Sequence, residues 1–208
     1  MKNAHNTNFL TRALEFSSIY NIWQNLSGSK KGIKKIIQEN LIPFNNSKIL
    51  DIGCGTGTLI EYMPYNVIYT GYDINPIYIE SAKKKYPDRG NFYCTSVNDA
   101  IAVEGYFDYV IAIGILHHLN DLDSKKLIQS AAYSLKENGC FISIEPVWTN
   151  EQSSIEKFIM KMDRGQNIRN ENSYLTLLSD FFLSTESRIY QGIFTIPWTI
   201  IVTKNYKK

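Results

Sequence analysis

Lys48-Ile49-Leu50-Asp51-Ile52-Gly53-Cys54-Gly55-Thr56-Gly57-Thr58-Leu59 is the stretch that decides the fold of this chain. Its first apolar residues suit a strand that is covered on both faces. The three glycines that follow leave a tight loop without side chains, and a helix is expected from Thr58 because apolar residues recur there at helical spacing. Open α/β sheets bind nucleotides at such a loop, at the carboxyl end of a parallel sheet.

The glycine spacing and a neighbouring charge separate this loop from phosphate-binding loops. The dinucleotide fingerprint requires a glycine where this chain has Thr58, and the Gly-Lys-Ser/Thr of a Walker loop does not follow. Asp51 would repel a pyrophosphate, although the start of a helix otherwise attracts anions. The loop therefore predicts a ligand that carries positive charge.

This pattern resembles the first motif of class I S-adenosylmethionine-dependent methyltransferases. Their cofactor carries an ammonium and a sulfonium group and no phosphate, in agreement with the charge argument. The resemblance covers residues 45–145 and implies S-adenosylmethionine as cofactor, with contacts from Asp51, Gly53, Cys54, Gly55 and Gly57. A glycine turn in another kind of α/β protein is the alternative interpretation of the loop taken alone.

Asp73 ends the next apolar run, 22 positions after Asp51. An acidic residue at this offset is placed to accept hydrogen bonds from ribose hydroxyls, and the alternative is a cap for the helix that follows. The segment Tyr72–Pro76 resembles the second methyltransferase motif, which implies that Ile74 packs on adenine. The family's adenine contact after the third strand would fall at Ser96 and Val97, or at Asp99.

The fourth strand, 107–113, leads into Gly114-Ile115-Leu116-His117-His118-Leu119 and resembles the corresponding family segment. The resemblance implies that Ile113 and Gly114 line the methionine end of the cofactor pocket. His117, His118 and Glu145, at the end of the fifth strand, are the candidate general bases, with structural roles as the alternative for the two histidines. No metal site is expected, because no carboxylate lies at ligand spacing from the histidine pair.

The order of elements predicts an α/β fold: a Rossmann-like, doubly wound, seven-stranded and mostly parallel sheet with a terminal antiparallel hairpin. Helices are expected near 58–63, 76–86 and 122–136, the last stopping at a left-handed Gly139. The two strands of the hairpin are expected at Ser184–Tyr190 and Thr195–Tyr206. A single domain would comprise an N-terminal helical lid (1–45), a cofactor-binding core (46–145), a substrate-side insert (146–182) and the C-terminal hairpin (183–208).

The lid and the insert supply the candidate substrate contacts. Tyr20 and Trp23 belong to the expected lid, although an aromatic there could simply pack on the sheet. Arg164 and Arg169 in the insert could hold an anionic group of a substrate, with local surface pairing as the alternative. The pattern around Asp163–Gln166 resembles a bacterial subgroup of methyltransferases that act on small molecules.

Composition narrows the class of protein further. A net charge of +2 over 208 residues gives no electrostatic footprint for nucleic acid. The three cysteines are scattered without a CxxC pair, so a reduced cytoplasmic setting is expected. No apolar run is long enough to span a membrane, and the polar N-terminus does not resemble a signal peptide.

These observations predict an S-adenosylmethionine-dependent methyltransferase that acts on an oxygen or nitrogen of a small molecule, such as a sugar or a secondary metabolite. One alternative is a methyltransferase for RNA or protein, although the Asn/Asp-Pro-Pro-Tyr motif of amino-directed nucleic-acid enzymes is absent after the fourth strand. Another is a cofactor-binding protein of the same fold without catalysis.

Overall fold

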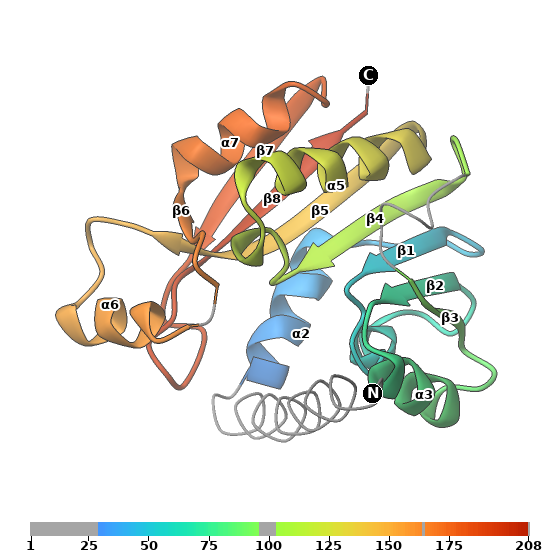
Figure 1. The fold of residues 1–208 in the computed structure, drawn as a ribbon. Helices are drawn as coiled ribbons and strands as arrows, with labels where there is room; N and C mark the ends of the chain where they lie inside the picture. The colour runs from blue at the N-terminus through green and yellow to red at the C-terminus, as the bar shows by residue number, and fades with distance from the viewer. Residues whose placement is uncertain (1–28, 96–102, 164, 208) are drawn as a thin grey trace, which may run out of the picture.

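The computed structural model describes residues 29–95, 103–163 and 165–207. Its sheet has the strand order β3-β2-β1-β4-β5-β8-β7, and a short β6 pairs with β5 outside this path (Figure 1). The strands are β1 Lys48–Ile52, β2 Ile68–Asp73, β3 Gly90–Cys94, β4 Phe107–Ile113, β5 Leu135–Trp148, β6 Arg169–Asn170, β7 Ser184–Tyr190 and β8 Ile200–Tyr206. The strands β1 to β5 are parallel to one another, and β8 runs antiparallel to β5 and β7, which confirms the predicted fold class.

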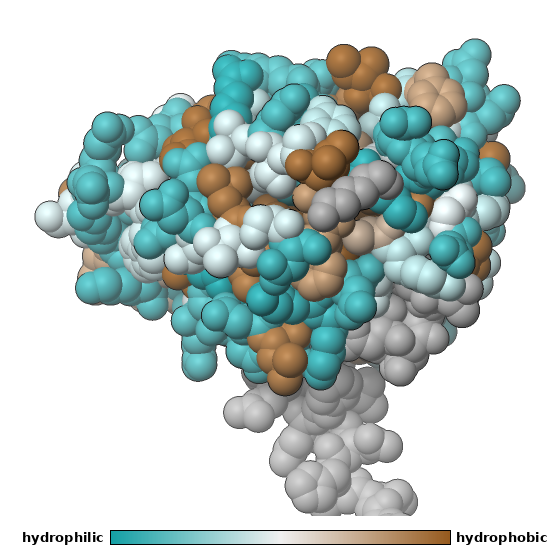
Figure 2. Space-filling view, turned by 90° about the horizontal axis from the view of Figure 1, so that it is seen from above, coloured by the Kyte–Doolittle hydropathy of each residue, from teal (hydrophilic) through white to brown (hydrophobic). Residues whose placement is uncertain are grey.

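Helices cover both faces of this sheet, as Figure 1 shows. The described helices are α2 Ser29–Asn40, η1 Thr58–Tyr62, α3 Pro76–Lys85, η2 Leu116–His118, α5 Asp121–Ser134, α6 Ser154–Lys161 and α7 Glu171–Ser179. None of them combines the length and the apolar character that a membrane crossing needs. Seen from above in Figure 2, hydrophobic residues are scattered among hydrophilic ones.

The two faces of the sheet carry separate hydrophobic cores because neighbouring strand residues point to opposite sides. Ile49 packs with residues of α2, η1 and α3, whereas Leu50 packs with residues of α5 and α7. Both side chains are fully buried, as expected for a central parallel strand. This double cover holds the carboxyl end of β1, and the loop that follows it, in a fixed position.

Three predicted boundaries need correction. The helix expected at 58–63 is a short 3-10 helix, η1. The helix expected at 122–136 ends at Ser134, with its C-cap at Leu135 in an extended conformation. The left-handed residue that follows is Asn138, at φ 61°, rather than Gly139. The last strand begins at Ile200 rather than at Thr195.

Candidate active site

The glycine loop leaves β1 in a left-handed conformation, with φ of 70° at Gly53, 54° at Gly55 and 75° at Gly57. Side chains with a Cβ rarely adopt these angles, which explains the three glycines. The backbone N–H groups of Gly53 and Cys54 donate to the carbonyl of Tyr72 at 2.7 and 2.9 Å. The loop is therefore tied to the end of β2.

Asp73, at the end of β2, faces this loop. Its two carboxylate oxygens accept from the backbone N–H groups of Gly55 (2.9 Å) and Asn75 (2.8 Å). The cap of α3 is Asn75, whose side chain accepts from Ile77 N at 3.0 Å, so Asp73 is not the helix cap. Ile74 beside it is 72% exposed, which leaves its side chain accessible to a ligand.

Asp51 is buried on β1, where its carboxylate accepts a hydrogen bond from the Tyr69 hydroxyl. Burial raises the pKa of Asp51 to about 7; the hydrogen bond from Tyr69 lowers it in part, and the charge of Asp73 raises it further. Burial also raises the pKa of the Cys54 thiol, and the charges of Asp51 and Asp73 add to the effect. Both carboxylates thus act on the same loop.

No cation compensates these two carboxylates within the described ranges. The salt bridges there involve other acidic groups, and neither Asp51 nor Asp73 pairs with a lysine or an arginine. Two acidic groups beside backbone with positive φ form a site of negative potential. Such a site favours a cationic ligand over a phosphate.

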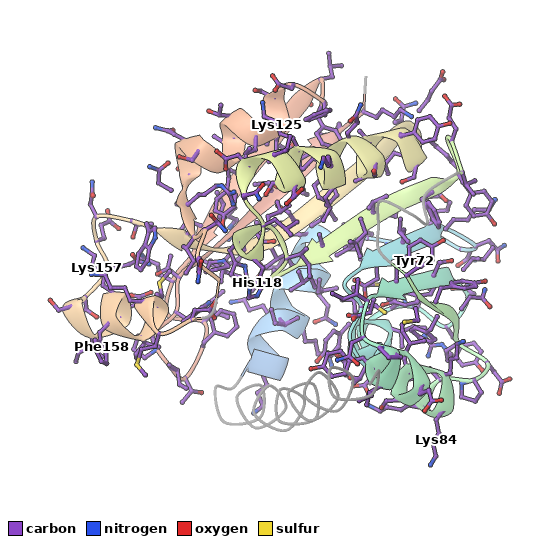
Figure 3. All side chains as sticks on the ribbon, in the orientation of Figure 1. Tyr72, Lys84, His118, Lys125, Lys157 and Phe158 are labelled. Atoms are coloured by element: carbon purple, nitrogen blue, oxygen red, sulfur yellow. The ribbon has the colours of Figure 1, made fainter. Side chains whose placement is uncertain are left out.

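The segment after β4 lies directly against the glycine loop. An added Cβ on Gly53 would lie only 2.3 Å from Cδ1 of Ile115. Gly114 has φ 66°, and its N–H donates to the carbonyl of Ile144 on β5 at 2.8 Å, while Ile113 is half-buried. The carboxyl ends of β1, β4 and β5 therefore meet at one edge of the sheet, where His118 also lies (Figure 3).

Glu145 of β5 forms hydrogen bonds with several groups of the segment after β4. Its Oε1 accepts from the backbone N–H groups of Ile115 (2.9 Å) and Leu116 (2.8 Å), and its Oε2 lies 3.3 Å from the N–H and 2.6 Å from Nδ1 of His117. The side chain of Glu145 is fully buried. Both of its oxygens have hydrogen-bond partners within the protein, which favours a positioning role for Glu145 over that of a general base.

His117 is enclosed between two carboxylates. Its Nδ1 faces Glu145, and its Nε2 lies 3.4 Å from Oδ1 of Asp163, in the segment after α6. Burial lowers the pKa of His117, but hydrogen bonding to Asp163 and Glu145 outweighs it and raises the pKa to about 9. The imidazole is protonated at neutral pH in this state, which argues against His117 as a general base.

The loop after α6 closes over His117. An added Cβ on Gly165 would lie 1.9 Å from Cδ2 of His117, so this close approach requires glycine. The N–H of Gly165 donates to Oδ1 of Asp163 at 2.6 Å, and the N–H of Asn167 donates to the carbonyl of His117 at 2.9 Å. Sequence reasoning did not assign Asp163 or Gly165 to the site.

His118 is exposed, and its ring centroid lies 4.0 Å from that of the buried His117. Partial desolvation lowers the pKa of His118, and the positive charge of His117 lowers it further. Its imidazole is therefore neutral at pH 7. Of the three candidate bases, it is the one that an incoming acceptor can reach.

Arg169, a predicted substrate contact, forms hydrogen bonds within the protein. It is buried, and its Nη2 and Nε donate to Oδ1 of Asp121 at 2.7 and 3.0 Å. The same guanidinium donates to the carbonyls of Leu116, Leu119 and Asn167. These hydrogen bonds connect the insert to the segment after β4, and they favour a structural role for Arg169.

The remaining predicted contacts lie outside the described residues. They are Tyr20 and Trp23 of the expected lid, Ser96, Val97 and Asp99 after β3, and Arg164 of the insert.

The fold and this site together define a class of protein. Parallel strands with helices on both faces, a glycine loop after β1 and an acidic residue after β2 are the arrangement of a nucleoside-binding α/β protein. Residues 49–139 match the family described as "Methyltransferase domain". Over this range the chain is similar to methyltransferases, in agreement with the class I S-adenosylmethionine-dependent motifs that its sequence resembles.

One curated protein is similar to this chain in sequence, and two solved structures are similar to it in fold. Ubiquinone biosynthesis O-methyltransferase of Bartonella quintana is 36% identical over 104 residues, which are 48% of this chain and 41% of that protein. Geranyl diphosphate C-methyltransferase of Streptomyces coelicolor, solved with Mg²⁺, geranyl-S-thiolodiphosphate and S-adenosyl-L-homocysteine, has a TM-score of 0.67 at 12% identity, covering 84% of this chain and 75% of that one. The [4+2]-cyclase SpnF has a TM-score of 0.65 at 15% identity, covering 83% and 80%. The chain thus spans less than half of its curated relative.

Proposed function

We propose that this chain binds S-adenosylmethionine and transfers its methyl group to an oxygen or nitrogen of a small molecule. The observation that carries the proposal is the pair of uncompensated carboxylates, Asp51 and Asp73, beside the left-handed glycine loop. The cofactor's ammonium and sulfonium groups supply positive charge to such a site, and its ribose offers hydroxyls to Asp73. S-Adenosyl-L-homocysteine in the Streptomyces enzyme supports this assignment.

The acceptor is the finer part of the proposal. The ubiquinone-pathway relative is named an O-methyltransferase, which favours a hydroxyl acceptor. The [4+2]-cyclase of the same fold shows that the architecture alone does not decide the reaction. Small molecules are favoured over nucleic acid because the net charge is only +2.

The reaction is an in-line displacement. The acceptor atom attacks the methyl carbon, the new bond forms as the carbon–sulfur bond breaks, and the electron pair stays on sulfur to give a neutral thioether. Because sulfonium is already an activated leaving group, alignment and exclusion of water are the main tasks of the protein, and orientation can supply about 7–11 kcal/mol. The exposed His118 is placed to receive the acceptor's proton.

Replacing Asp73 by alanine is expected to weaken S-adenosylmethionine binding by roughly 1–3 kcal/mol, about 5- to 150-fold in Kd, because the ribose hydroxyls lose a charged acceptor. Isothermal titration calorimetry measures this change directly. Asp88→Ala, at an exposed carboxylate, is the matched control and should bind like the unaltered protein.

Two outcomes of this calorimetry would contradict the proposal. Binding of NAD in place of S-adenosylmethionine would refute the cofactor assignment. An unchanged Kd in Asp73→Ala would refute the ribose role. Cofactor binding without methylation in a screen of labelled transfer to sugars, phenols and amines would favour a cofactor-binding protein without catalysis.

A further inference from the structure

We propose that His117, His118 and Asp163 bind a divalent transition-metal ion of the zinc class on the acceptor side of the methyl-transfer site. The inference rests on the proposed function for its chemistry but not for its geometry. Sequence spacing had argued against a metal, because the carboxylates nearest to the histidines in space are distant along the chain: Glu145 by 28 positions and Asp163 by 46 from His117.

The three donors lie close together, and one pair of them is spaced as two ligands of one ion. One ligand atom from each residue lies within 4.8 Å of the other two. Nε2 of His117 and Oδ1 of Asp163 are 3.4 Å apart. Two ligands that each lie about 2.0–2.2 Å from a tetrahedral zinc ion are themselves separated by about 3.3–3.6 Å. This gap exceeds the usual length of a charge-assisted hydrogen bond, about 2.7–2.9 Å, but suits an ion between the two atoms.

Glu145 prepares His117 for this role. A metal-bound histidine commonly donates its other ring N–H to a carboxylate, which fixes the tautomer and the ring orientation. Nδ1 of His117 lies 2.6 Å from Oε2 of the fully buried Glu145. A metal ion would displace the proton from Nε2, while the proton on Nδ1 stays with Glu145, and the freed lone pair of Nε2 would face the ion beside Asp163. Glu145 is itself held by the N–H groups of Ile115 and Leu116.

The position of Asp163 is also fixed by contacts within the protein. Oδ1 of Asp163 accepts from the N–H of Gly165 at 2.6 Å, and the close approach of Gly165 to the ring fixes the loop over His117. The third donor, His118, is exposed beside them. Three protein ligands with one side open to solvent are the arrangement of a catalytic zinc site, which keeps a position for water or substrate.

The open position suits an acceptor hydroxyl. A metal ion lowers the pKa of a bound oxygen, so that the hydroxyl loses its proton to solvent before attack on the methyl carbon. In this state His118 is a ligand, and it no longer serves as the proton acceptor. The competing interpretation is a metal-free ion-pair clamp that closes the insert over β5.

The test uses the full chain, depleted of metal with a chelator and then titrated with Co²⁺. One equivalent should bind and give the visible absorption bands of a tetrahedral cobalt ion with nitrogen and oxygen ligands. Zn²⁺ should displace it. Asp163→Asn and His118→Ala should each weaken cobalt binding at least tenfold. Because neither side chain is fully buried, circular dichroism should show that both variants keep the fold. Asp180→Asn, at an exposed carboxylate paired with Lys125, is the matched control.

Equal cobalt affinity in Asp163→Asn, His118→Ala and the control would overturn the metal site, as would the absence of bound cobalt. Calorimetry with S-adenosylmethionine on the same samples separates the two hypotheses. If the cofactor binds and cobalt does not, the metal inference fails and the proposed function stands. If one cobalt ion binds at these ligands and the cofactor does not, the metal site stands and the proposed function fails.

Discussion

Replacing Glu145 by alanine will lower the free energy of unfolding by about 3–5 kcal/mol. This is the usual cost of removing one partner from a buried ion pair, because the other charge is left without compensation. Here the loss affects the imidazole of His117 and also the N–H groups of Ile115 and Leu116, which Glu145 satisfies. Urea unfolding at neutral pH, followed by circular dichroism, measures the change.

Two variants bracket this prediction. Glu145→Gln keeps the shape and one acceptor oxygen, so it should recover part of the lost stability. Glu137→Ala removes an exposed carboxylate shortly before the buried part of β5 and should change stability by less than about 0.5 kcal/mol. If Glu145→Ala unfolds at the same urea concentration as Glu137→Ala, Glu145 does not organise the segment after β4.

The core of the fold is predictable from local patterns. The mostly apolar run before the glycines predicts a buried strand. The structure agrees, since every residue from Ile49 to Ile52 is buried in β1. Three glycines within five residues predict a left-handed loop, since glycine adopts positive φ angles more readily than any other residue. Both features depend on short segments of the chain, and the family motifs lie in the same segments.

The histidine cluster could not be predicted in this way. Its parts come from the segment after β4, from β5 and from the loop after α6, and they meet only when the sheet is assembled. The partners of Arg169 could not be predicted either, because they are carbonyl groups of the segment after β4 that the sequence does not place beside the insert. Tyr69 was not assigned to the site either, since its hydroxyl reaches Asp51 across the β1–β2 pair.

Replacing Asp51 by asparagine will stabilise the protein at alkaline pH. Burial raises the pKa of Asp51 from 3.8 to about 7, so the folded state holds a proton that the unfolded state has already lost between these values. The free energy of unfolding therefore falls as pH rises from about 4 to 7. Above pH 7, where Asp51 is ionised in both states, the loss amounts to roughly 4 kcal/mol, because each unit of pKa shift corresponds to about 1.36 kcal/mol. The amide side chain in Asp51→Asn would keep an acceptor for the Tyr69 hydroxyl without carrying the charge.

The comparison between two pH values isolates this effect. Urea unfolding of both proteins at pH 5 and pH 8 should show that the advantage of Asp51→Asn is about 3 kcal/mol larger at pH 8, because other titrating groups cancel between the variants. An equal difference at both pH values would mean that Asp51 is ionised throughout.

The negative charge of Asp51 should also attract the cofactor. Asp51→Asn should therefore bind S-adenosylmethionine more weakly, although it unfolds less readily. Calorimetry of the unaltered protein at pH 6 in two buffers with different ionisation enthalpies should detect release of a proton from Asp51 on binding, since a cationic ligand favours its ionised form. A carboxylate that destabilises the empty fold is then retained because the cofactor compensates its charge.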